Sequence, residues 1–459
     1  MTVGPTKGAS IHVPDAREVA YEITRRVSEE GAYLGLLVRY SMGRSGLDSR
    51  DRALVSELCY GVQRHRGKLD FIISNFSDKP LEKIRPEVLD LLRLGAYQIA
   101  FMRVPDHAAV YESVELAKRR LSPGSAAFVN AVLRKVASSY KGLDWPGRED
   151  FARFLETEYS HPRWLIDYIM GYMERDEAEA FCRSNNKHQG MTLRVNPHIF
   201  DRETLLEEIR RKGGSASLSQ FLGEALVKVQ VPWDELQRLL EQGACVVQDE
   251  SSMLVSHAVC PGANMTIIDA CAAPGGKATH MAQMGGKSCR VLAIDKSAAR
   301  LEALRNLARR LGLKNVEPVI GDAIHLGRHI ALAADAVLVD APCSGLGTLR
   351  RRPELKWRRS EEELESFFKV QLALLEGSSE LLRPGGALVY SVCTFTREET
   401  TQVIEAFLKR HPDFHPESLK PFLPPLLREW VSEQGNIQLM PHIHNMEGMF
   451  IARMARSRA

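Results

Sequence analysis

Two cysteines stand where a thiolate could act as a nucleophile. Cys343 and Cys393 each come directly after a run of residues that predicts a β-strand. A thiolate attacks electrophilic carbon, and a nearby positive charge lowers the pKa of its parent thiol. Lys277 is a candidate for that charge, and Asp340 is a candidate for a hydrogen bond to a reacting ring. These residues alone do not indicate which of the two cysteines attacks.

Acidic residues recur at the ends of successive strand-like runs, where open α/β sheets bind ligands. Asp269, Asp295, Asp322 and Asp340 occupy these positions. After the first of them comes a loop of mostly small residues, namely Cys271, Ala272, Ala273, Pro274, Gly275, Gly276 and Lys277. The loop lacks both the Gly-x-Gly-x-x-Gly of dinucleotide sites and the Gly-Lys-Ser/Thr of ATP sites. The joint pattern predicts an adenosine-bearing cofactor without phosphates, S-adenosylmethionine, with Asp295 on its ribose and Asp322 near its adenine.

A methyl sulfonium beside a cysteine pair favours methylation at carbon-5 of a pyrimidine. That carbon is a poor nucleophile until a thiolate adds at carbon-6 and makes the ring enamine-like. Enzymes that methylate exocyclic amines carry an Asn/Asp-Pro-Pro-aromatic turn after the fourth strand, where this chain has Asp-Ala-Pro-Cys. Methylation of a protein amine gives a cysteine nucleophile no role. We therefore expect neither of these two classes.

Alternating strands and helices over residues 241–459 must position these groups. Strands are expected at 265–270, 290–295, 316–320, 336–340 and 387–392. A helix is expected at 297–311, and the alternation predicts an α/β, Rossmann-like domain. Upstream, residues 1–142 show only helical periodicity and predict an all-α domain. Residues 143–240 mix a strand-like run at 191–197 with helical runs and predict a small α+β subdomain.

Composition excludes several classes of protein. The 459 residues are 44% hydrophobic and 26% charged, as in folded proteins. Because the formal net charge is only +3, nucleic-acid binding would need local basic patches. No Cys-x-x-Cys pair occurs, so no metal is expected. Without a signal peptide in the first twenty residues or a membrane-spanning apolar run, we expect a cytoplasmic protein, which we take to be a monomer.

A basic run follows the turn that carries Cys343. Its cations are Arg350, Arg351, Arg352, Lys356 and Arg358, with Trp357 among them. Such a run is often a solvated face. Here its place beside the expected mouth of the cofactor site favours contact with RNA phosphates and an unstacked base.

At these residues the chain resembles the Sun (Fmu) family of RNA cytosine-5 methyltransferases. The resemblance covers nearly the whole chain and rests on DACAAPGGK (269–277), DAPCSGLGTLRRRPELKW (340–357) and SVCTFTREE (391–399). It implies that the loop 271–277 and the aspartates at 295, 322 and 340 bind S-adenosylmethionine. It further implies that Cys393 is the nucleophile and that Cys343 assists release of the methylated RNA. The bacterial members that act on 16S rRNA are nearest, which implies a specific cytosine of 16S rRNA as the target and a covalent cysteine–cytosine adduct.

The resemblance also extends to the two upstream domains. Residues 1–142 resemble NusB, an all-helical RNA-binding module, and 143–240 take the place of a small RNA-recognition-like subdomain. The chain departs from the family with Val-Cys-Thr at 392–394, where many relatives have Thr-Cys-Ser. It also has Glu-Gly-Met-Phe at 447–450, where Asp-Gly-Phe-Phe is usual. A tRNA cytosine-5 methyltransferase and a non-catalytic NusB-like RNA-binding factor stay open as alternatives.

Overall fold

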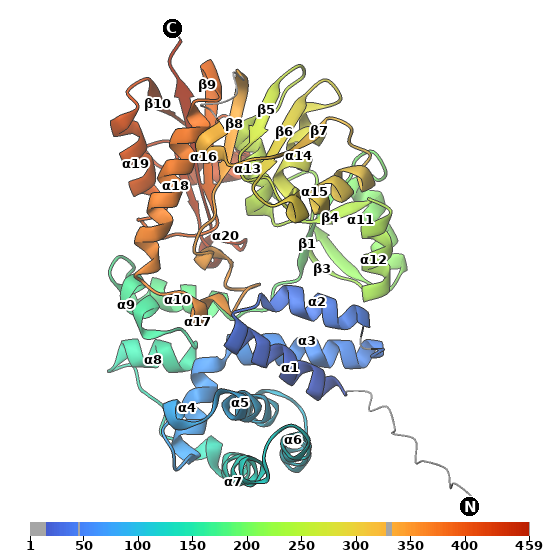
Figure 1. Ribbon diagram of the computed structural model, residues 1–459, viewed down its shortest axis with the longest axis vertical. Coiled ribbons are helices and arrows are strands. Elements are labelled where there is room, and N and C mark those ends of the chain that lie inside the picture. Colours follow the sequence, from blue (N-terminus) through green and yellow to red (C-terminus); the bar gives the residue numbers. More distant parts are fainter. Residues whose placement is uncertain (1–14, 45, 327–332, 459) are drawn as a thin grey trace, which may run out of the picture. The chain divides into compact units, whose positions relative to one another are not determined.

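The computed structural model describes residues 15–44, 46–326 and 333–458. The chain forms two compact units (Figure 1). The first comprises Met1–Asn186 and Arg352–Arg358, and the second comprises Lys187–Arg351 and Arg359–Ala459. The first fourteen residues of the predicted N-terminal domain lie outside the described residues.

Helices and 3-10 turns build the described part of the first unit. They are α1 (Ala16–Glu30), α2 (Leu34–Arg44), α3 (Ser49–Arg64), α4 (Arg66–Phe76), η1 (Leu81–Lys83), α5 (Pro86–Phe101), α6 (Asp106–Arg120), α7 (Pro123–Ser139), η2 (Tyr140–Gly142), α8 (Phe151–Glu158), α9 (Arg163–Met170), α10 (Arg175–Asn185) and α17 (Leu355–Arg358). Side-chain oxygens of Asp15, Asp48 and Ser122 cap α1, α3 and α7 by accepting backbone N–H groups. Apolar faces of α1 to α7 share one core, and the predicted all-α domain is confirmed.

The short segment 352–358 is part of the first unit, although the residues on either side of it belong to the second. Lys356 is fully buried, and its ammonium donates to three oxygens of the same unit: Arg64 O at 3.2 Å, Ser160 O at 3.0 Å and Asn186 Oδ1 at 2.8 Å. Trp357 Nε1 donates to Gln63 O at 2.8 Å. Burial lowers the pKa of Lys356 well below its ordinary value. The three acceptors offset the cost of burying this amine.

The second unit begins with a four-stranded antiparallel sheet in the order β2-β3-β1-β4. Its strands are β1 (Met191–Val195), β2 (Ser215–Leu218), β3 (Ala225–Gln230) and β4 (Cys245–Val247). Helices α11 (Arg202–Arg211) and α12 (Trp233–Glu241) pack on it and complete its core. This is the predicted α+β subdomain. Its last strand begins after residue 240, and α8 to α10, from the same predicted range, belong to the first unit.

A larger sheet in the order β10-β12-β9-β8-β5-β6-β7 forms the rest of the second unit, with β11 paired to β12. Its strands are β5 (Thr266–Asp269), β6 (Arg290–Asp295), β7 (Val316–Ile320), β8 (Ala334–Asp340), β9 (Leu382–Val392), β10 (Phe414–Glu417), β11 (Ile437–Leu439) and β12 (Met449–Arg456). The five strands β5, β6, β7, β8 and β9 run parallel to one another, and β12 is antiparallel to its neighbours β9, β10 and β11. The five predicted strands are confirmed. Strand order changes direction between β5 and β8, and such a switch point is where α/β sheets bind ligands.

Helices cover both faces of this sheet (Figure 1). One face packs against α13 (Glu250–Val259), α14 (Gly276–Gly285) and α15 (Ala298–Arg310), and the other against α16 (Ala323–Leu326), α18 (Glu363–Ser379) and α19 (Thr401–Arg410). Ile267 of β5 joins the first core and its neighbour Ile268 joins the second, as the alternation of a strand requires. The remaining short elements are η3 (Leu346–Thr348), η4 (Pro425–Trp430) and α20 (Pro441–His444). Among the described residues, no helix has the length and apolar character needed to cross a membrane.

Candidate active site

Aspartates stand at the carboxyl ends of neighbouring parallel strands in the second unit. Asp269, Asp295 and Asp340 are the last residues of β5, β6 and β8, and Asp322 follows β7. Asp269 pairs in register with Ala293 of β6 and with Leu338 of β8. The structure therefore brings the predicted strand-end acids to one edge of the sheet, on either side of the switch point.

The loop 271–277 leads from this edge into α14. Gly275 has a φ of 108°, and a Cβ on it would lie 2.8 Å from Leu304 Cγ, so a larger residue would be strained and crowded. Ala272 and Ala273 are buried, whereas Pro274 is exposed and Cys271 is partly buried. α14 begins at Gly276, and the first N–H groups of a helix have no partner within it. A helix N-terminus behind small residues suits the carboxylate of an amino-acid ligand.

The buried carboxyl of Asp269 fits a cofactor that carries positive charge. Neither of its side-chain oxygens accepts a hydrogen bond of regular geometry from the described residues, although the nearby Cys271 backbone N–H acts to lower its pKa. Burial raises the pKa of Asp269 to about 7, and the charge of Asp340 adds to this effect. Because an unpartnered buried carboxyl is costly, a cationic ligand at this edge would stabilise it. S-adenosylmethionine has both an ammonium and a sulfonium.

Asp295 and Asp322 offer the acceptors that an adenosine needs. Asp295 is buried, and its Oδ1 accepts from Ser297 N at 2.9 Å, which fixes the carboxylate at the strand end. Asp322 is partly exposed and pairs with Lys296 Nζ at 2.9 Å. A carboxylate can accept from ribose hydroxyls or from an adenine amino group. These residues fit the predicted cofactor, and their individual roles stay predictions.

The two cysteines meet beside this edge. Cys343 Sγ and Cys393 Sγ lie 3.2 Å apart, although 50 residues separate them in the chain. Their loops are joined by hydrogen bonds from Gly347 N to Cys393 O at 3.0 Å and between the hydroxyls of Ser344 and Thr394 at 2.9 Å. The hydrogen bond to Cys393, together with burial, raises the pKa of Cys343 well above its ordinary value. Cys343 is therefore a thiol at neutral pH.

Lys277 and Asp340 form an ion pair next to the cysteines. Lys277 Nζ lies 2.8 Å from Asp340 Oδ2, and Ser391 Oγ donates to Asp340 Oδ1 at 2.8 Å. Burial acts to lower the pKa of Lys277, but Asp340 and the nearby Cys393 outweigh it, and the net pKa is raised. The lysine is thus a lasting positive charge within electrostatic reach of Cys393. The sequence suggested this role for Lys277, but it could not give the distance between Lys277 and the cysteines.

Glu399 holds the two cysteine loops in place and was not singled out from the sequence. This fully buried carboxylate accepts from three groups: Ser344 N at 2.8 Å, Gln371 Nε2 at 3.0 Å and Thr396 Oγ1 at 2.8 Å. Gln371 Nε2 also donates to Pro342 O at 3.0 Å. The acid therefore connects the turn after β8, the helix α18 and the turn after β9. Glu399 is the last residue of the segment SVCTFTREE, and this position in a family motif could have drawn attention to it.

Comparison with known proteins places this arrangement in a family. A model described as 16S rRNA methyltransferase RsmB/F matches residues 257–455. A NusB family model matches 14–138, and a ferredoxin-like domain model of RsmF/B-like methyltransferases matches 161–232. The chain is 36% identical over 444 residues to the "Probable ribosomal RNA small subunit methyltransferase B" of Bacillus subtilis (strain 168), covering 96% of this chain and 98% of that one. This chain belongs to the RsmB/F family of 16S rRNA methyltransferases.

Two further comparisons agree with membership of the RsmB/F family. The "Ribosomal RNA small subunit methyltransferase B" of Vibrio cholerae is 32% identical over 414 residues, covering 89% of this chain and 90% of that one. The crystal structure of PH0851 superposes with a TM-score of 0.81 at 26% identity, covering 97% of this chain and 100% of that one. The predicted enzyme class, an rRNA methyltransferase with S-adenosylmethionine as cofactor, is confirmed, as is the predicted fold class. The non-catalytic alternative is thereby set aside.

The basic run needs a correction. Lys356 and Arg350 were expected to face RNA, but both are buried and hydrogen-bonded. Arg350 donates to Pro441 O and to the side chain of Gln189, and the acceptors of Lys356 lie within the first unit. The remaining cations differ in their surroundings: Arg352 is exposed, Arg351 pairs with Asp249 at 2.8 Å, and Arg358 lies over the ring of Tyr33 at 4.6 Å. RNA contact by these three stays a prediction.

Glu447, just before β12, is a buried acid near the cysteines. Burial raises the pKa of Glu447 to about 8, the Asp249 carboxylate adds to the effect, and Arg351, with Nε 3.3 Å from Oε1, opposes it. The ordinary pKa is 4.5, so between these two values the folded chain holds a proton that the unfolded chain releases. The free energy of unfolding therefore falls as the pH rises through this window.

We expect Glu447→Gln to remove this loss of stability. Relative to wild type, the variant should gain about 2–4 kcal/mol between pH 5 and pH 8.5, because glutamine mimics the protonated acid. Thermal unfolding midpoints at both pH values, followed by circular dichroism, measure the gain. The exposed Glu361 provides a control, and Glu361→Gln should leave the pH profile unchanged. A Glu447→Gln midpoint that falls relative to wild type as the pH rises would contradict the argument.

Proposed function

We propose that the chain methylates carbon-5 of a specific cytosine in 16S rRNA through a covalent bond between Cys393 Sγ and carbon-6 of that base. The observation that carries this proposal is the 3.2 Å contact between Cys343 Sγ and Cys393 Sγ at the ends of adjacent parallel strands. Methylation of an exocyclic amine or of a hydroxyl has no use for such a pair. Membership of the RsmB/F family supports the choice of RNA.

The first step is addition of the Cys393 thiolate to carbon-6. The Lys277 ammonium favours the thiolate, because a positive charge nearby lowers the pKa of a thiol. As the new sulfur–carbon bond forms, the electron pair of the carbon-5–carbon-6 double bond moves toward carbon-5 and the rest of the ring. Asp340, fixed by Lys277 and Ser391, is placed to hydrogen-bond the ring nitrogen or the exocyclic amine and stabilise the adduct.

The second step transfers the methyl group and restores the ring. S-adenosylmethionine, when bound, supplies an electrophilic methyl group on its sulfonium. After carbon-5 has taken that methyl group, a base removes the carbon-5 proton, the double bond re-forms and the Cys393–carbon-6 bond breaks. The balance is one carbon-5 proton exchanged for one methyl group, with Cys393 returned as a thiolate.

The assignment of the nucleophile to Cys393 rests on the family resemblance. Cys343 has a raised pKa, so it keeps a proton that it can donate. A thiol is a weak hydrogen-bond donor, but a thiolate acceptor strengthens the bond through its charge. A thiol 3.2 Å from the leaving sulfur can donate a hydrogen bond to the Cys393 thiolate as the adduct breaks down. Release of product is the step in which Cys343 would act.

The product nucleoside tests the proposal. Purified protein with S-adenosylmethionine is expected to form 5-methylcytidine in unmodified 16S rRNA, detected by chromatography and mass spectrometry of the nucleoside digest. Bulk unmodified tRNA, under the same conditions, should gain none. Formation of N4-methylcytidine would refute the carbon-5 chemistry. Formation of 5-methylcytidine in tRNA alone would keep the chemistry and change the substrate.

A further inference from the structure

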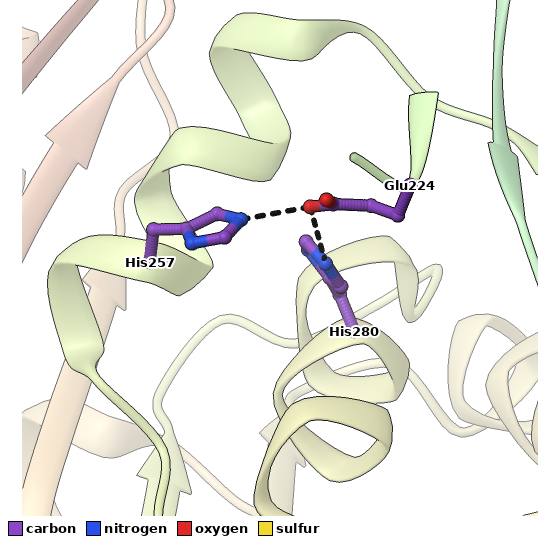
Figure 2. Close-up of side chains that lie close together, drawn as sticks. All are labelled: Glu224, His257 and His280. Carbon is purple, nitrogen blue, oxygen red and sulfur yellow. Dashed lines mark hydrogen bonds and ion pairs between the residues drawn. The ribbon is translucent and has the colours of Figure 1, made fainter. Parts of the chain in front are cut away.

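Three potential metal ligands converge in the second unit, and the sequence analysis singled out none of the three. Figure 2 shows Glu224 in the turn before β3, His257 on α13 and His280 on α14, with both imidazole rings directed at the carboxylate. His257 Nε2 lies 2.7 Å and His280 Nε2 lies 3.2 Å from the same atom, Glu224 Oε1. All three donor atoms lie within 4.8 Å of one another.

The spacing of these atoms is close to that of a coordination shell. Zinc bonds of about 2.0–2.2 Å to imidazole nitrogen and carboxylate oxygen, at tetrahedral angles, place neighbouring donors about 3.4 Å apart. The separations of Glu224 Oε1 from the two Nε2 atoms, 2.7 and 3.2 Å, would change by less than an ångström on closing around an ion. The two imidazole donors, which lie within 4.8 Å of each other, would have to reach the same spacing. Two imidazoles and a carboxylate are, moreover, a ligand set that zinc commonly uses.

We propose that Glu224, His257 and His280 bind a divalent transition-metal ion of the zinc type, through Oε1 and the two Nε2 atoms. Three protein ligands leave a fourth position for water. The side chains of Glu224 and His257 are 24% and 26% exposed, so an ion can enter from solvent, whereas His280 is 3% exposed and anchors the site. None of the three ligands is a cysteine, so this ligand set shares no residue with the cysteine pair of the active site.

The bound ion would join the small sheet to the helix that follows the cofactor loop. The backbone O of Glu224 accepts from Val195 N of β1 at 2.8 Å, so this turn is tied to the four-stranded sheet. His280 follows Lys277 by less than one turn of α14. Arg194 spans the same region, because its guanidinium donates to Gly276 O at 2.6 Å and to Thr279 Oγ1 at 2.9 Å. An ion here would reinforce a junction that Arg194 already makes.

We expect moderate affinity rather than that of a closed structural zinc site. His280 Nδ1 has no hydrogen-bond partner among the described residues, and metal-binding imidazoles usually hold their second nitrogen with one. The positive charge of Arg194 acts on both Glu224 and His280, which further opposes a cation. The site therefore calls for a titration with the metal in excess rather than for analysis of metal carried through purification.

Cobalt(II) is a suitable probe because its absorption spectrum distinguishes binding to this cluster from binding to the cysteines. Untagged full-length protein is titrated with Co²⁺ and then with competing Zn²⁺, and the visible d–d bands and the near-ultraviolet thiolate-to-cobalt band are recorded. We expect one Co²⁺ per chain with visible bands and no thiolate band, displaced by Zn²⁺. His257→Ala should weaken binding by more than about 100-fold, since loss of even an outer partner of a metal ligand costs about 10- to 100-fold. His415→Ala alters an exposed histidine of β10 outside the cluster and should bind as wild type does.

Three results would overturn the proposal. Absence of cobalt and zinc binding to wild type would leave the cluster as a histidine–glutamate hydrogen-bond network. A thiolate band, or binding that His257→Ala leaves unchanged, would place the ion elsewhere in the chain. Because His257→Ala could disturb folding, Glu224→Gln is titrated as well, since it keeps the shape of the side chain and loses the charged ligand. Wild-type affinity in folded Glu224→Gln would likewise refute the site.

Discussion

Cys393→Ala is expected to abolish methyl transfer to 16S rRNA, with a loss of at least about 10⁴-fold, because removal of a covalent nucleophile costs other enzymes this much or more. Without the sulfur, nothing adds to carbon-6, and carbon-5 keeps the low nucleophilicity of an aromatic ring. The change removes one partly buried atom and leaves Lys277, Asp340 and the cofactor loop intact. Transfer of a radiolabelled methyl group to 16S rRNA under single-turnover conditions measures the loss. Circular dichroism verifies that the variant is folded.

The matched control for this variant is Cys260→Ala. Cys260 is an exposed cysteine of the same unit at the end of α13, outside the sheet edge that carries the two active-site cysteines. Cys260→Ala should keep wild-type activity, which would show that the loss of a cysteine elsewhere in the unit does not abolish methyl transfer. A folded Cys393→Ala protein that retained more than about one hundredth of wild-type activity would rule out an obligatory adduct on Cys393.

Local pattern predicted most of the fold, because periodicity and strand ends are local properties. The helix expected at 297–311 is α15, and the five parallel strands lie where apolar runs placed them. The antiparallel edge was not predicted. Its strand β11 has three residues, Ile437–Leu439, and β10 contains Pro416, so neither has the length or the composition that marks a strand.

The positive charge of the basic run did not reveal that some of its residues are buried. Residues 350–359 have the composition of a solvated or RNA-binding face, and two of the cations are nevertheless inside the protein. What buries Lys356 is a set of acceptors far away in sequence, such as Arg64 O, 292 residues distant, and Ser160 O, 196 residues distant. Periodicity and composition describe neighbours in the chain, and these partners are neighbours only in space.

The same reason divides the predicted from the unpredicted parts of the site. The acids at 269, 295, 322 and 340 could be found because the carboxyl ends of parallel strands necessarily share one edge of a sheet. No such rule links Glu399 to Ser344, or His257 to Glu224, which lies 33 residues away with no recognised metal-ligand spacing. The sequence therefore led to the expectation of no metal, whereas the fold brings together three potential ligands from a turn and two helices.

Cys343→Ala is expected to trap the covalent RNA adduct. Cys343 is protonated and lies 3.2 Å from Cys393, so it can donate a hydrogen bond to the sulfur that leaves carbon-6. A hydrogen bond to a charged group contributes about 1.5–3 kcal/mol, so its loss should slow release by about 10- to 100-fold. The adduct then accumulates and appears as a slowly migrating RNA–protein band on a denaturing gel, when the variant is mixed with 16S rRNA and S-adenosylmethionine.

The double variant Cys343→Ala/Cys393→Ala separates the roles of the two sulfurs. It should form no band, because the atom that would hold the RNA is gone, while Cys260→Ala should behave as wild type and show only a transient band. Trapping by Cys393→Ala instead of Cys343→Ala would exchange the roles, since the remaining sulfur must be the one bonded to carbon-6. If Cys343→Ala formed no band and turned over as fast as wild type, the 3.2 Å contact would have no part in release. The contact would then serve only to position the nucleophile.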